Sequence, residues 1–96
     1  MTKDEIISYL KSQKEYFMQK YKISKLALFG SFSRDENTQN SDIDIAIQTP
    51  IKDYFLLYDL KEELENKFHT KVDLIRLRDK MNHALKRRIE KDGIYI

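Results

Sequence analysis

LALFGS at residues 26–31 is separated by ten residues from DIDIAI at residues 42–47, and both stretches predict β-strands. The first is a short apolar run ended by Gly30, which is typical of a buried strand rather than a helix. The second covers residues 43–48 and stops before Pro50, because proline cannot donate a hydrogen bond to a ladder. The polar segment between them predicts a loop with room for one helical turn.

The second strand carries two carboxylates. Successive side chains of a strand point to opposite faces, so Asp42 and Asp44 share one face while the isoleucines share the other. Two like charges held together raise each other's proton affinity unless a cation lies between them, and a divalent metal ion is the usual cation. The alternative is an acidic pair that bonds only to loop backbone and to Arg34.

Capping residues and apolar periodicity predict three helices and two further short strands. The expected helices begin at Thr2, Asp53 and Asp79, and they end near residue 20, before His69 and at Gly93. The further strands are expected at residues 72–75 and 94–96. Without an internal repeat or a linker, this order predicts one α/β (α+β) domain over residues 1–96, with a small mixed sheet flanked by helices.

The strand at residues 72–75 carries a further acid, Asp73, which interrupts an apolar run and therefore needs a partner. As a third oxygen ligand it suits Mg²⁺, which keeps positions open for water and phosphates. Three carboxylates in one cleft are typical of phosphoryl or nucleotidyl transfer, in which two ions serve the attacking and the leaving oxygen. The alternative is a structural ion pair with Lys71, with Arg76 or with a lysine elsewhere in the chain.

The turn after the first strand supplies features that bind phosphate. Gly30 permits a tight turn and the close approach of an anion to backbone N–H groups, and Ser31 adds a hydroxyl donor. A helical turn over residues 32–36 would aim more N–H groups at the same place. Arg34, on this loop, either contacts phosphate or carries a solvated charge.

The composition of the chain excludes some kinds of site and disfavours some partners. The chain has no cysteine, so disulfides and thiolate metal sites are excluded and oxygen ligands remain. No apolar run approaches the roughly 20 residues that span a bilayer, and no signal peptide is evident, so we expect a cytoplasmic protein without a membrane partner. The net charge is +2, and the basic residues near the C-terminus are typical of a solvated helix face, which makes nucleic acid a less favoured partner.

These residues resemble the signature of the DNA polymerase β nucleotidyltransferase superfamily. That signature consists here of Gly30-Ser31, ten residues, Asp42-Ile43-Asp44 and a later strand aspartate, Asp73. Over nearly its whole length the chain is similar to the minimal nucleotidyltransferases, the MNT proteins usually encoded beside a HEPN-domain protein. It departs from the pattern at Asp35, because the family commonly has a glycine after the basic residue of this loop.

The resemblance implies a polymerase β palm-like fold and a role for each site residue. Asp42 and Asp44 coordinate two Mg²⁺ ions, Asp73 completes the metal site and helps to activate the acceptor hydroxyl, and Gly30 and Ser31 hold ATP. Family members that act as antitoxins transfer AMP to a tyrosine of a HEPN ribonuclease toxin and bind that toxin. We therefore expect a nucleotidyltransferase antitoxin with this substrate, these ions and a HEPN partner in a hetero-oligomer.

Two other functions stay open at this point. In the first, the chain neutralises a toxin by occlusion and the nucleotide site is vestigial. Asp35, an acid near the bound phosphate, and the missing second domain that would grip the base support this alternative. In the second, the chain transfers a nucleotide to a small molecule or to RNA. Larger relatives with those activities carry a second domain, which we do not expect in this chain.

Overall fold

The computed structural model describes all 96 residues and contains four helices and four strands. In chain order they are α1 (Lys3–Ser12), α2 (Lys14–Tyr21), β1 (Lys25–Phe29), β2 (Ile43–Gln48), α3 (Tyr54–Phe68), β3 (Val72–Arg76), α4 (His83–Asp92) and β4 (Ile94–Tyr95). None of these helices is both long and apolar enough to cross a membrane.

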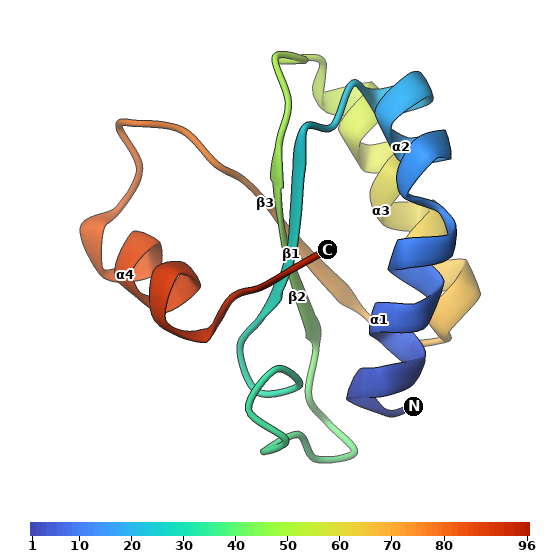
Figure 1. Cartoon of the computed structure of the whole chain (residues 1–96), viewed down its shortest axis with the longest axis vertical. Helices are drawn as coiled ribbons and strands as arrows, with labels where there is room; N and C mark the ends of the chain where they lie inside the picture. The colour runs from blue at the N-terminus through green and yellow to red at the C-terminus, as the bar shows by residue number, and fades with distance from the viewer.

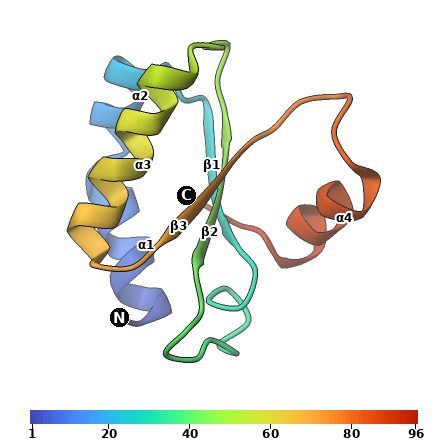
Figure 2. The ribbon, with the colours of Figure 1, turned by 180° about the vertical axis from the view of Figure 1, so that it is seen from behind.

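The strands form one mixed sheet in the order β3-β2-β1-β4. β1 is antiparallel to both β2 and β4, whereas β2 and β3 are parallel and are joined through α3. Helices α1, α2 and α3 cover one face of the sheet, and α4 stands alone on the other (Figures 1 and 2). The predicted small mixed sheet flanked by helices is therefore confirmed.

The two faces of the sheet differ in how much apolar surface they bury. Ile43, Ile45 and Ile47 of β2 belong to a cluster of 16 buried residues beneath the three helices. The opposite face has a cluster of five buried residues, in which Phe29 of β1 packs with Ile89 of α4. Because side chains alternate along a strand, the residues of β2 that interleave with the isoleucines lie on this second face.

The expected first helix is two helices, which is a correction to the sequence prediction. α1 ends at Ser12 and α2 starts at Lys14, although apolar residues continue at helical spacing through both. The Ser12 hydroxyl donates to the Tyr9 carbonyl at 2.7 Å, and the Gln13 N–H is shared between the Tyr9 and Leu10 carbonyls. A side chain that bonds back to the preceding turn bends a helix, which explains the break.

The last helix starts later than the sequence indicates. Asn82, not Asp79, is its N-cap, and the Asn82 side chain accepts a hydrogen bond from the Leu85 N–H at 3.1 Å. The connection is longer because Met81 is buried against the sheet before the helix begins. Gly93 ends the helix as predicted, with a φ of −64°, and a Cβ there would lie 2.4 Å from the Ile89 carbonyl oxygen.

The segment that joins β1 to β2 begins with a hydrogen-bonded turn rather than a regular helix. The N–H groups of Ser33 and Arg34 both donate to the Gly30 carbonyl. Asp35 ends the turn in the left-handed region, with a φ of 57°. Its carboxylate accepts a hydrogen bond from Lys3 Nζ at 2.9 Å, at the start of α1.

This geometry explains the glycine that resembling sequences have at the position of Asp35, and it leads to a prediction. Asp35→Gly keeps the turn and removes the cost of a left-handed side chain, roughly 1 kcal/mol, while losing an exposed ion pair of about the same size or less. Denaturant unfolding should therefore give a stability equal to or above that of the natural chain. Asp35→Val should lower the stability by more than about 1 kcal/mol, because a β-branched residue resists this conformation. Equal losses in both variants would contradict the argument.

Candidate active site

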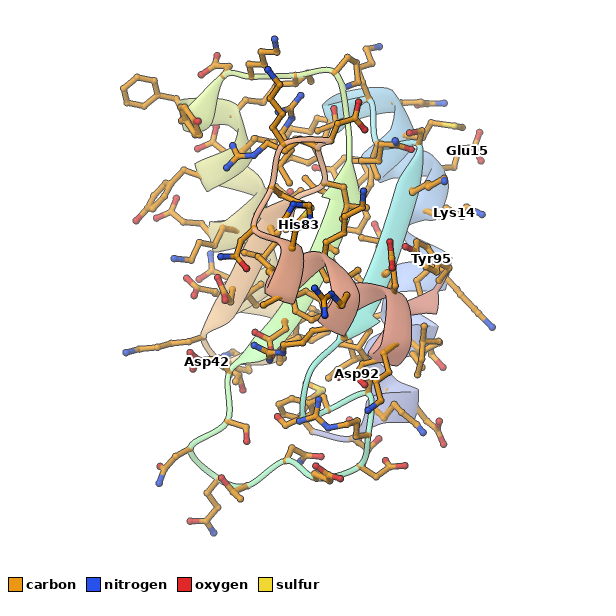
Figure 3. All side chains as sticks on the ribbon, turned by 90° about the vertical axis from the view of Figure 1, so that its left-hand side faces the viewer. Lys14, Glu15, Asp42, His83, Asp92 and Tyr95 are labelled. Atoms are coloured by element: carbon orange, nitrogen blue, oxygen red, sulfur yellow. The ribbon has the colours of Figure 1, made fainter.

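The sheet brings the three predicted aspartates to one face. Asp44 is aligned with Phe29 of β1 on one side and with Asp73 of β3 on the other. Aligned residues of neighbouring strands point to the same face and lie about 5 Å apart. Asp42 precedes β2 by one residue and lies at the start of that strand (Figure 3). The acids therefore line the face that α4 covers.

None of these three carboxylates has a protein partner. The ion pairs of the structure are Lys3 with Asp35 and Arg34 with Glu36 and Asp92, so the pairing of Asp73 with Lys71 or Arg76 is not formed. Arg76 instead donates from Nε to the Thr49 carbonyl at 3.1 Å. The two alternatives that would give these acids a purely structural role are therefore absent from the structure.

Burial and the neighbouring acids together perturb the middle acid. Burial is the largest cause, and the charges of Asp73 and, to a smaller extent, Asp42 add to it, so that the pKa of Asp44 is raised from 3.8 to about 6. The guanidinium groups of Arg88 and Arg34 act in the opposite direction. The site thus carries the clustered negative charge that a bound cation would relieve.

Gly30 is required by both its conformation and its surroundings. Its φ is +77°, and a Cβ at this position would lie 2.1 Å from Asp44 Oδ2. The N–H groups of Ser31 and Phe32, which follow it, donate to no backbone acceptor. The turn therefore presents free N–H donors next to the acids, as a phosphate-binding turn does.

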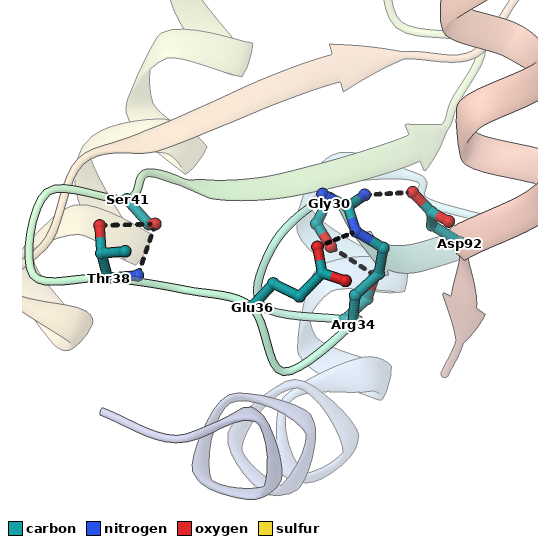
Figure 4. A network of polar contacts seen from close by, with 7 residues as sticks. Gly30, Arg34, Glu36, Thr38, Ser41 and Asp92 are labelled. Carbon is teal, nitrogen blue, oxygen red and sulfur yellow. Dashed lines mark hydrogen bonds and ion pairs between the residues drawn. The ribbon is translucent and has the colours of Figure 1, made fainter.

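Two residues of this region were missed by sequence analysis. Ser33 is buried, and its hydroxyl donates to the Gly30 carbonyl at 2.7 Å, which closes the turn. Asp92 of α4 accepts a hydrogen bond from Arg34 Nη1 at 2.5 Å, while Arg34 Nε donates to Glu36 at 3.1 Å (Figure 4). A serine three residues after a turn glycine is a local signal for the first contact, whereas nothing in the sequence signals the second.

The residues present fit magnesium. The side chains do not converge into a finished set of three metal ligands. Mg²⁺, however, is commonly held by one or two carboxylates, with water and substrate phosphates completing its coordination. Asp42 and Asp73 are exposed, and Asp44 has no donor of its own, so all three offer oxygen atoms to such an ion.

A glycine-serine turn set against paired aspartates, with a third acid on the next strand, defines a nucleotidyltransferase. A family model described as polymerase beta nucleotidyltransferase matches residues 11–96. The chain belongs to this polymerase β nucleotidyltransferase family.

Relatives and solved structures agree with this assignment. A protein of Methanocaldococcus jannaschii named protein adenylyltransferase MJ1379 is 41% identical over 98 residues, which covers 99% of this chain and 98% of that protein. A toxin–antitoxin crystal structure with AMP-PNP has a chain with a TM-score of 0.72 and 27% identity, covering 99% of this chain and 72% of its own length. The MNT antitoxin in complex with the tri-AMPylated HEPN toxin of Shewanella oneidensis matches with a TM-score of 0.62 and 26% identity, covering 97% of this chain and 66% of its own length.

Because Gly30 lies against Asp44, we expect a larger residue at position 30 to clash and a smaller residue at position 44 to relieve that clash. Gly30→Ala should lower stability by about 2 kcal/mol or more, because the methyl group meets Asp44 Oδ2 and the left-handed φ remains costly. In Gly30→Ala/Asp44→Ala the contacts with Oδ2 and Cγ are gone and only the Asp44 Cβ remains close, at 3.2 Å. More than half of the loss should therefore be recovered, with about 1 kcal/mol left for the backbone. Urea unfolding of both variants and of Asp44→Ala measures the coupling. Strictly additive effects would show that the two residues do not touch.

The raised pKa of Asp44 predicts a pH dependence of stability in metal-free buffer. Between pH 4 and pH 6 the folded chain keeps a proton on Asp44 that the unfolded chain has released, so the free energy of unfolding falls as pH rises. Asp44→Asn should flatten this part of the profile, measured by thermal unfolding in EDTA. Asp79→Asn, a change outside the site, should keep the natural slope. A natural profile that does not fall over this range would contradict the prediction.

Proposed function

We propose that the chain transfers AMP from ATP, with Mg²⁺, to a tyrosine hydroxyl of a HEPN-domain ribonuclease, and that it thereby acts as the antitoxin of that partner. The observation that carries this proposal is the register that sets Asp44 beside Asp73 and against the Gly30 turn. The names of the relatives support AMP as the transferred group, and the solved complexes support a HEPN protein as the acceptor. The AMP-PNP complex supports ATP as the donor.

Each part of the site has a role in this reaction. Mg²⁺, held by Asp42, Asp44 and Asp73, would polarise the α-phosphate and stabilise the departing pyrophosphate. The free N–H groups of Ser31 and Phe32 and the Ser31 hydroxyl hold phosphate oxygens. The acceptor oxygen bonds to the α-phosphorus as the bond to the β-phosphate oxygen breaks, and Asp73, which is exposed, takes the hydroxyl proton.

Catalysis is favoured over neutralisation by occlusion because of how Asp35 is placed. The case for a vestigial nucleotide site depends on an acid that repels phosphate. The carboxylate of Asp35 is instead bonded to Lys3 of α1, a helix that covers the face of the sheet opposite the aspartates (Figure 1). Its charge is partly neutralised there by Lys3, which weakens any repulsion of phosphate.

The proposal predicts that the metal-binding acids are essential for labelling. With α-³²P-ATP, Mg²⁺ and the proposed HEPN-domain partner, the natural chain should label that partner. Asp42→Ala and Asp44→Ala should each reduce labelling by more than about 100-fold, because several kcal/mol of transition-state stabilisation are lost with the metal. Mass measurement of the partner should show added AMP, on tyrosine.

Asp79→Ala, an acidic residue outside the site, is the matched control and should label normally. Undiminished labelling by Asp44→Ala would overturn the proposed function. If the Asp42→Ala/Asp44→Ala double variant still forms the complex and still protects cells from the toxin, occlusion rather than transfer is the means of neutralisation.

A further inference from the structure

One stripe of α4 faces the site. Leu85, Arg88, Ile89 and Asp92 are spaced as i, i+3, i+4 and i+7, which places all four on one side of a helix. Leu85 and Ile89 pack into the apolar cluster beneath α4, so this side is turned toward the sheet face that carries the aspartates. Arg88 therefore lies on the inward side of the helix, next to buried residues, although its own side chain is accessible.

An ion pair connects the end of α4 to the turn that follows β1. Asp92 is only 9% exposed and contacts Arg34. A carboxylate in the last turn of a helix is disfavoured by the helix dipole, so Asp92 is a costly residue at this position unless a cation compensates it. Arg34 provides that cation, and the contact holds α4 at a set place beside the turn. The position of Arg88, one helical turn earlier, is set by the same contact.

The two arginines whose charges act on Asp44 differ in whether they are already paired with a carboxylate. Arg34 is paired with two carboxylates, those of Glu36 and Asp92, so its charge is already compensated. Arg88 takes part in none of the ion pairs of the structure. Its charge also acts on the Asp44 carboxyl more strongly than that of Arg34 does, which agrees with a guanidinium close to the aspartates. A triphosphate bound there needs a free cation, and guanidinium matches phosphate geometry well.

We propose that Arg88 is a phosphate-binding residue of this site, and that it contacts the nucleotide triphosphate from the α4 side, opposite the Gly30-Ser31 turn. This assignment rests on the proposed function, because it takes the nucleotide to bind between the turn and the aspartates. It shifts the main cationic contact from Arg34, the candidate that the sequence offered, to Arg88, which lies 54 residues further along the chain. Arg34 then serves as the positioning residue that anchors α4.

The adjacent residue supplies a matched control for the test. Arg87 has the same charge and is also exposed. It lies on the other side of α4, because at about 100° per residue it is turned roughly 200° away from both Leu85 and Ile89. AMP-PNP binding in the presence of Mg²⁺, measured by titration calorimetry on the full chain, is the readout. Arg88→Gln should weaken binding by about 10- to 100-fold, the value of a charge-assisted hydrogen bond. Arg88→Lys should restore part of the loss, and Arg87→Gln should stay within about twofold of the natural chain.

The outcomes separate the two proposals. Equal affinities for Arg88→Gln and Arg87→Gln, with both variants folded by circular dichroism, would overturn the role of Arg88 and leave the proposed function standing. No binding of AMP-PNP by the natural chain would overturn the proposed function and the role of Arg88 with it. Loss of binding in both variants would point to a general effect of positive charge and would also contradict a specific contact by Arg88.

Discussion

The carboxylate of Asp44 lies against the bare Cα of Gly30, and the layout of the site follows from that contact. β1 and β2 approach closely enough at this point that a Cβ on Gly30 would overlap Asp44 Oδ2. The chain therefore leaves β1 in a left-handed turn directly beside the acid, which sets free backbone N–H groups next to negative charge. The parallel pairing of β2 with β3 brings Asp73 to the other side. Free N–H donors and carboxylate oxygens are thereby adjacent without any long insertion.

The same arrangement lowers the stability of the protein when no cation is bound. Burial, together with repulsion from the other two carboxylates on this face, raises the pKa of the middle one to about 6. Local conflicts of this kind are found at functional sites and persist because the rest of the structure outweighs them. Here the larger apolar cluster lies on the opposite face of the sheet, beneath three helices. The strands are thus held in register by contacts that do not involve the site, and this rigidity keeps the acids together.

Much of this structure could be predicted from the sequence where alternation, a capping residue or a proline gives a strong local signal. Strand β2 has the predicted bounds because alternation begins it and Pro50 ends it, and the same alternation puts Asp42 and Asp44 on one face. α3 follows from its Asp53 cap and its ending at His69.

The break between α1 and α2 at Gln13 could not be predicted, because the apolar spacing continues through it and only a serine hydroxyl disturbs the helix. The start of α4 was misplaced because tertiary burial of Met81 sets the length of its connection. The contact of Arg34 with Asp92 joins residues 58 positions apart, which no local pattern can indicate.

One face of the sheet is densely covered and the other carries a single helix. Amino-acid substitutions on the two faces are therefore constrained in different ways. Substitutions beneath α1, α2 and α3 are constrained by packing, because a lost methylene there costs stability whatever the substrate. Substitutions on α4 act on a small cluster and on exposed charges, so they alter the surface beside the acids at little cost to folding. This helix can therefore vary in sequence while the packed face of the sheet and the three acids stay the same.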